Sequence, residues 1–202
     1  PAVSAREPSS GSRIAEFTQQ IRQFFVTSRS RFAILGASLF WAAAATLRVI
    51  LIAWAPLVLL SKNASEIAEL TLFLAIGIIV GSALVPRLIP LEHLRRARFA
   101  AYLMSLFIIV LSFTDTVWSA RTALFVIGTA GGMFIVPVNA ALQEIGYKTI
   151  GSGGAVAMQN FFQNVAMLLA VGSYTLMASI NVSPVTSMLV LGLLVFSAPI
   201  VV

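Results

Sequence analysis

Long apolar runs, separated by short polar stretches, cover most of this chain. An α-helix rises about 1.5 Å per residue, so about 20 apolar residues cross the roughly 30 Å hydrocarbon core of a membrane. Runs of about this length occupy residues 32–60, 67–88, 99–118, 120–142, 154–180 and 185–202. The pattern predicts an all-α membrane protein, a bundle of six transmembrane helices.

The composition excludes a soluble fold. Of the 202 residues, 59% are hydrophobic and 10% are charged, whereas a soluble domain carries roughly 25% charged residues. So few charges cannot cover the surface of a soluble domain, but they suffice at the two ends of a bundle that lipid surrounds. The net charge of +6 does not indicate a nucleic-acid partner, because the arginines lie between apolar runs and form no basic stripe.

The basic residues predict the orientation of the bundle, because cytoplasmic loops carry an excess of Lys and Arg. One side collects most of them, namely Arg6, Arg13, Arg22, Arg29, Arg31, Arg87, Arg95, Arg96, Arg98 and Lys148. The other side keeps only Lys62 and Arg121. We therefore expect a multi-pass protein with both ends of the chain in the cytoplasm.

Residues 1–31 differ in character from residues 32–202, and we expect two regions. The first is a linker that begins with small residues, Ser and Pro. It then carries apolar residues at helical spacing, namely Ile14, Phe17, Ile21, Phe24 and Phe25. This predicts an amphipathic helix that lies on the inner membrane surface or joins two domains. Because the chain starts at Pro1 and stops inside an apolar run, we expect it to be a fragment.

Metal and thiol chemistry are not expected. The chain has no Cys and a single His, His93, so we expect no metal site and no cofactor. His93 follows Glu92 in a basic connection, and adjacent residues on a helix do not face each other. An intramembrane acyltransferase is therefore a weak alternative, and we do not expect an enzyme.

Arg48 lies near the middle of the first predicted span, with apolar neighbours on both sides in sequence. An arginine at the centre of a span costs about 2.5–3.5 kcal/mol on insertion scales, so something must offset it. A guanidinium matches phosphate or carboxylate, which favours an anchor for an anionic substrate. The alternative is a structural or gating ion pair with a partner outside this chain.

Amide side chains form a second candidate cluster in the fifth predicted span. Gln159 and Gln163, like Asn160 and Asn164, are four residues apart, so each pair shares a helix face. Interhelical hydrogen bonds are at least as good an explanation as ligand contact. We expect Asn160 and Asn164 to face a cavity, and we add Gln159 and, from the preceding span, Asn139 as candidate substrate-binding residues.

Three further residues are candidates for gating or structure. We expect Glu144 near the cytoplasmic edge, in a salt bridge with Lys148 or with arginines of the basic connection. Trp41 and Trp54 flank Arg48 and could wall a cavity or contact lipid. The sequence GSGG at 151–154 lacks a Walker lysine, so we expect a flexible connection and not a phosphate loop. The pairs Gly77/Gly81 and Gly128/Gly132 predict close helix packing.

Four segments together resemble one family: SLFWAAAATLRVILIAWAPLVL, AIGIIVGSAL, GTAGGMFIVPVNAALQEIG and AVAMQNFFQNVAMLL. Over residues 29–202 they are similar, in order and spacing, to the C-terminal six helices of bacterial lysophospholipid transporters of the major facilitator superfamily. Arg48 matches the first-span arginine of this half, and Gln159, Asn160 and Asn164 match its amide motif. Gln163 stands where an acidic residue is expected in some members, and Gly153 or Gly154 replaces an expected Asn.

The resemblance implies a transporter in the bacterial inner membrane. Such a protein moves lysophosphatidylethanolamine and related lysolipids to the cytoplasmic leaflet for re-acylation. Its expected partners are the lysophospholipid, an N-terminal six-helix half, membrane lipids and, as a further candidate, a lysophospholipid acyltransferase. A proton-coupled drug or amphiphile exporter of the same superfamily is the main alternative, and a structural subunit is another.

Overall fold

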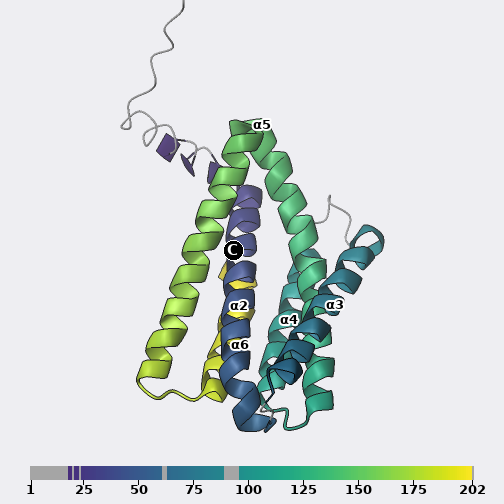
Figure 1. Cartoon of the computed structure of the whole chain (residues 1–202). Helices are drawn as coiled ribbons and strands as arrows, with labels where there is room; N and C mark the ends of the chain where they lie inside the picture. The colour runs from purple at the N-terminus through teal and green to yellow at the C-terminus, as the bar shows by residue number, and fades with distance from the viewer. Residues whose placement is uncertain (1–17, 20, 23, 61–62, 89–95, 202) are drawn as a thin grey trace, which may run out of the picture.

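The fold of the described residues is entirely helical. The computed structural model describes residues 18–19, 21–22, 24–60, 63–88 and 96–201. Its helices are α2 (Ser28–Val58), α3 (Ala64–Leu88), α4 (Ala97–Ser112), α5 (Val117–Ser179) and α6 (Pro184–Val201) (Figure 1). The predicted all-α class is confirmed for this part of the chain.

Helix α5 consists of two arms that fold back on each other at Gly151 (Figure 1). Its 63 residues would form a rod of about 95 Å at 1.5 Å per residue, about three times the thickness of a hydrocarbon core. Gly151 interrupts the rod with φ 78° and ψ 163°, a conformation that is essentially restricted to glycine. We call residues 117–150 the first arm and residues 152–179 the second arm.

The predicted flexible connection around GSGG is wrong. The first arm remains helical up to residue 150, and Ser152, Gly153 and Gly154 already belong to the second arm. One glycine in a conformation that other residues rarely adopt is enough to reverse the chain. A longer loop is therefore not needed between the two arms.

Thr27 and Thr116 cap the starts of α2 and α5. The helix boundaries there differ from those that the apolar pattern predicted. The predicted third span extended to residue 118, but α4 ends at Ser112. Thr116 then caps α5, since its side chain accepts a hydrogen bond from the backbone N–H of Ser119. This satisfies one of the free N–H groups at a helix start. Thr27 caps α2 in the same way, through the N–H of Ser30.

Helix α3 and the first arm of α5 pack with their backbones in contact. A Cβ atom added at Gly77 would overlap the carbonyl oxygen of Phe125, and one added at Gly128 would overlap that of Leu74. The close packing predicted from the glycine pairs is confirmed. Glycine is required here because any side chain would force the two helices apart.

Three of the helices are long and apolar enough to cross a membrane: Ser28–Val58, Ala64–Leu88 and Val117–Ser179. Two shorter apolar helices, Ala97–Ser112 and Pro184–Ala198, lie beside them. Because the two arms of α5 run in opposite directions, both of them pass along the bundle beside the other helices (Figure 1).

Most of the predicted linker, residues 1–31, lies outside the described residues. Its last part packs onto the turn of α5. Phe24 is 1% exposed and lies near Gly146. The rings of Phe25 and Phe162 are 5.4 Å apart. His93 also lies outside the described residues.

Candidate functional site

A cavity of about 250 Å³ lies between α2, α3, α4 and the first arm of α5. Its walls are mainly apolar, with Leu74, Met104 and Ile127 among the lining side chains. Arg48 and Asn139 supply the charged and amide groups of its lining. The cavity therefore combines a hydrocarbon-like wall with one cation and one amide, a pattern that small-molecule sites share.

Arg48 lies on the exposed surface of the bundle and contributes to the cavity from that side. Its neighbour in sequence, Leu47, is buried in the core, whereas Arg48 itself is exposed. Within the described part of the chain, the ion pairs are Arg29 with Glu144, Lys148 with Glu144, and Arg121 with Glu69. None of them uses Arg48, so its guanidinium is available to an anion or to another chain segment.

The two tryptophans that flank Arg48 have different environments. Trp41 is 39% exposed, lines the cavity, and forms a T-shaped pair with Phe40 at a distance of 5.5 Å between ring centres. Trp54 is fully buried in the core, and it does not belong to the cavity lining. Of the pair, only Trp41 is placed to contact a molecule in the cavity.

The amides of the second arm of α5 separate into two faces. Gln159 donates a hydrogen bond of 3.3 Å to the side-chain oxygen of Asn139, and this bond links the second arm to a residue of the cavity lining. Asn160 and Asn164 are exposed, and the amide of Asn164 donates to the backbone oxygen of Asn160. Neither contributes to the cavity that Arg48 and Asn139 line.

Gln163 is a buried polar residue whose inward position the sequence did not predict. Its side chain is buried, with 8% exposure, and its Nε2 has no hydrogen-bond partner among the described residues. The sequence signal for its burial was its spacing, because Gln163 lies four residues after Gln159 and therefore on the same face of the second arm. The sequence could not identify that face as the inward one.

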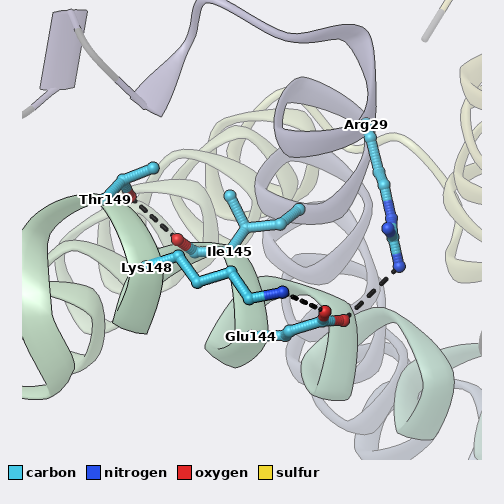
Figure 2. Close-up of polar contacts among 5 residues, drawn as sticks. All are labelled: Arg29, Glu144, Ile145, Lys148 and Thr149. Atoms are coloured by element: carbon cyan, nitrogen blue, oxygen red, sulfur yellow. Dashed lines mark hydrogen bonds and ion pairs between the residues drawn. The ribbon is translucent and has the colours of Figure 1, made fainter.

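Glu144 joins the start of α2 to the first arm of α5, as Figure 2 shows. It accepts a hydrogen bond of 2.8 Å from Lys148 and lies 3.6 Å from a guanidinium nitrogen of Arg29. The predicted salt bridge with Lys148 is present. The hydrogen bond from Lys148, aided by the charges of Lys148 and Arg29, lowers the pKa of Glu144.

At the opposite end of the bundle, Arg121 ties α5 to α3. Its guanidinium bonds Glu69 and lies 5.5 Å from the ring centre of Phe73 and 5.0 Å from that of Trp118. Cation–π contacts of this kind hold an arginine in place at an interface. Arg121 is therefore engaged in joining helices and is not part of the Arg48 cavity.

These features define a helical membrane protein with a polar site beside an apolar cavity. Comparison with curated proteins then identifies its relatives. The chain is 40% identical over 158 residues to the lysophospholipid transporter LplT of Photorhabdus laumondii, covering 78% of this chain and 40% of that protein. It is 36% identical over 190 residues to LplT of Klebsiella pneumoniae and 38% identical over 191 residues to LplT of Shigella flexneri. Each of these two alignments covers 92% of this chain and 48% of the relative.

The chain is thus homologous to lysophospholipid transporters and spans about half the length of the curated relatives it matches. No family model matches it, and no solved structure matches it. The resemblance noted from the four sequence segments is confirmed by these alignments.

Proposed function

We propose that this chain is the C-terminal six-helix half of a twelve-helix lysophospholipid transporter of the major facilitator superfamily. In this proposal the two arms of α5 are separate spans, and the chain crosses the bacterial inner membrane six times. The other half of the transporter would be an N-terminal six-helix bundle that precedes this chain in sequence. The alignments cover about half of the length of each LplT protein, which supports this division into two halves.

The observation that carries the proposal is the guanidinium of Arg48, which forms no ion pair with any residue that the structure describes and lies at the edge of an apolar cavity. A lysophospholipid has one acyl chain and a phosphate, so it needs an apolar wall and a cation. Secondary transporters bind substrate near the midplane of the membrane, between their repeats. Arg48 lies on the bundle surface, where a second half could close the site around a bound headgroup.

In the proposed mechanism, Arg48 binds the lipid phosphate and Asn139 contacts another polar group of the head. The planar fork of the guanidinium can donate two parallel hydrogen bonds to phosphate oxygens. Gln159 holds Asn139 in position through the bond between the arms. Trp41 contributes a flat apolar surface beside the head.

Lysolipid uptake by spheroplasts that contain the full-length transporter tests this function. We expect wild-type protein to take up lysophosphatidylethanolamine whether or not a proton gradient is present. Efflux driven by the gradient, without lysolipid uptake, would support the amphiphile exporter instead. The cavity lining offers no carboxylate for proton coupling among the described residues.

Two substitutions at Arg48 then test the site. Charged hydrogen bonds contribute roughly 1.5–3 kcal/mol, so Arg48→Ala should lower uptake about 10- to 100-fold at an unchanged protein level. Arg48→Lys should restore part of the activity. Arg31→Ala is the matched control, because Arg31 is exposed on the same helix and its guanidinium bonds the side chain of Ser28, outside the Arg48 cavity. Loss of expression in Arg48→Ala would indicate an assembly role.

A further inference from the structure

The indole of Trp41 lies on the same side of α2 as the guanidinium of Arg48. Trp41 precedes Arg48 by seven residues, which is about two helical turns, or about 10 Å along the axis. Long side chains on a helix lean toward its N-terminus, and from Arg48 this is the direction of Trp41. Both side chains line the Arg48 cavity. A ligand in this cavity can therefore reach the guanidinium and the indole ring together.

Part of the Trp41 ring system remains open to such a ligand. Trp41 forms a T-shaped pair with Phe40, which can cover only one of the two faces of the indole. The Trp41 side chain is exposed, whereas Phe40 is buried. None of the cation–π contacts found in the described part of the chain uses Trp41. One face of the Trp41 indole is therefore available to a cationic group.

The polar groups of the cavity suit an anion and leave an ammonium group without an acceptor. The guanidinium of Arg48 can only donate hydrogen bonds, and the side-chain oxygen of Asn139 already accepts from Gln159. The described lining residues include no carboxylate. An ammonium group is also repelled by the charge of Arg48. What the described lining offers to a cation is the aromatic rings of Phe40 and Trp41, and tryptophan is the strongest of the aromatic partners.

A tryptophan elsewhere in the same fold already holds a cation. Near the start of α5, the guanidinium of Arg121 lies 5.0 Å from the ring centre of Trp118. Aromatic rings bind ammonium ligands by the same attraction, at distances up to about 6 Å from the ring centre. The contact between Arg121 and Trp118 therefore gives the distance expected for an ammonium group above the Trp41 ring.

We propose that Trp41 binds the ammonium group of a zwitterionic lysophospholipid head while Arg48 binds its phosphate. In lysophosphatidylethanolamine a short two-carbon bridge joins the phosphate to the amine. A phosphate held by Arg48 can therefore place the amine against a ring two helical turns away, on the side away from the guanidinium. This proposal rests on the proposed transport function and names the residue that distinguishes heads with an amine from heads without one.

Uptake of two lysolipids by the full-length transporter in spheroplasts tests the role of Trp41. Lysophosphatidylethanolamine and lysophosphatidylglycerol with the same acyl chain share the phosphate, but only the first carries an ammonium group. Trp41→Leu should raise the KM for lysophosphatidylethanolamine about 3- to 10-fold, as expected for a partly exposed cation–π contact. The KM for lysophosphatidylglycerol should stay unchanged. Equal increases for both lysolipids would overturn the proposal, because they would mean an apolar wall or a structural role.

Fluorinated tryptophans at position 41 give a second measurement that a structural role would not affect. Fluorine withdraws electrons from the ring face and leaves the shape of the indole nearly unchanged. The KM for lysophosphatidylethanolamine should therefore rise stepwise with the number of fluorine atoms, and no such dependence would overturn the proposal. Trp118→Leu is the matched control, because Trp118 is an exposed tryptophan outside the cavity. The ratio of the two KM values should remain that of the wild type in this variant.

The outcomes separate this inference from the proposed function. The role of Trp41 alone would be refuted if the wild-type transporter takes up both lysolipids, Arg48→Ala impairs the uptake of both, and Trp41→Leu leaves the ratio of the two KM values unchanged. Failure of the wild-type transporter to take up either lysolipid would refute the proposed function and this inference with it.

Discussion

The two arms of α5 have similar apolar sequences but very different packing. Most buried residues of α5 lie in the first arm, whereas the second arm buries only Ala155, Met158, Gln163 and Tyr174. The first arm meets α3 through glycines, with backbone against backbone. The second arm leaves a groove beside α2 and α6. The first arm therefore lies in the closely packed centre of the bundle, whereas the second arm leaves unfilled space beside it.

This difference shows that apolar character does not by itself mean close packing in a membrane protein. A helix with small residues on one face can approach a neighbour until the backbones touch. A helix with amides and larger side chains on its inward face leaves space that lipid, substrate or another bundle can fill. The following predictions test this contrast, from the largest effect to the smallest.

Substitution of Gly128 should have the largest effect. A Cβ at Gly128 would overlap the carbonyl oxygen of Leu74, which cannot move without shifting α3. We expect Gly128→Leu to destabilise the folded protein by about 3 kcal/mol or more. Gly172→Ala on the second arm is the control and should change stability by less than about 0.5 kcal/mol, since nothing lies within 4 Å of its added Cβ. Thermal unfolding in detergent measures both, and similar losses would contradict the contrast between the arms.

Substitution of Gly151 should disturb the junction of the arms. Its φ of 78° is unfavourable for any residue with a Cβ, so Gly151→Ala should cost about 1–3 kcal/mol. Gly153→Ala is the matched control, because Gly153 is helical and its added Cβ meets nothing within 4 Å.

The chain has no Cys, so spin labels can be placed with Tyr147→Cys and Val156→Cys, which are both exposed. We expect Gly151→Ala to broaden the distance distribution between these two labels across the turn. An unchanged distribution together with unchanged stability would mean that the turn does not depend on glycine.

The hydrogen bond between the arms should contribute little. Gln159 and Asn139 are joined at 3.3 Å, and hydrogen bonds between membrane helices average about 0.6 kcal/mol. A double-mutant cycle with Asn139→Leu and Gln159→Leu should give a coupling energy near that value. A coupling energy above about 1.7 kcal/mol would show that the bond is a principal connection between the arms.

The smallest effect should come from Glu144, which is exposed at the edge of the first arm. Its folded-state pKa lies below the ordinary value of 4.5 because of Lys148 and Arg29. The stabilisation is therefore fully present above pH 4.5 and is lost as the pH falls through the lowered pKa. Glu144→Gln should lower the melting temperature slightly at neutral pH and leave it unchanged in acid.

Asp115→Asn is the control for Glu144→Gln. Asp115 is exposed and takes no part in the ion pairs found in the described part of the chain. We expect no change in the melting temperature at either pH. A Glu144→Gln effect that persists in acid would have to arise from something other than the carboxylate charge.

Several features could be predicted from the sequence because they depend on local chemistry. Apolar length predicted the helices, and the glycine pairs predicted close packing between α3 and α5. The charge pattern placed Glu144 beside Lys148, four residues away on the same helix face. The sequence also located the reversal near GSGG, although it could not show that Gly151 alone provides it.

The orientation of the helix faces was decided only by the tertiary structure. The sequence favoured Asn160 and Asn164 for the cavity, but the structure turns Gln163 inward and leaves both asparagines exposed. It places Trp41 at the cavity and Trp54 in the core. In water, an apolar stripe marks the buried face of a helix. In lipid the outside is as apolar as the inside, so only the neighbouring helices determine which side chains a site can use.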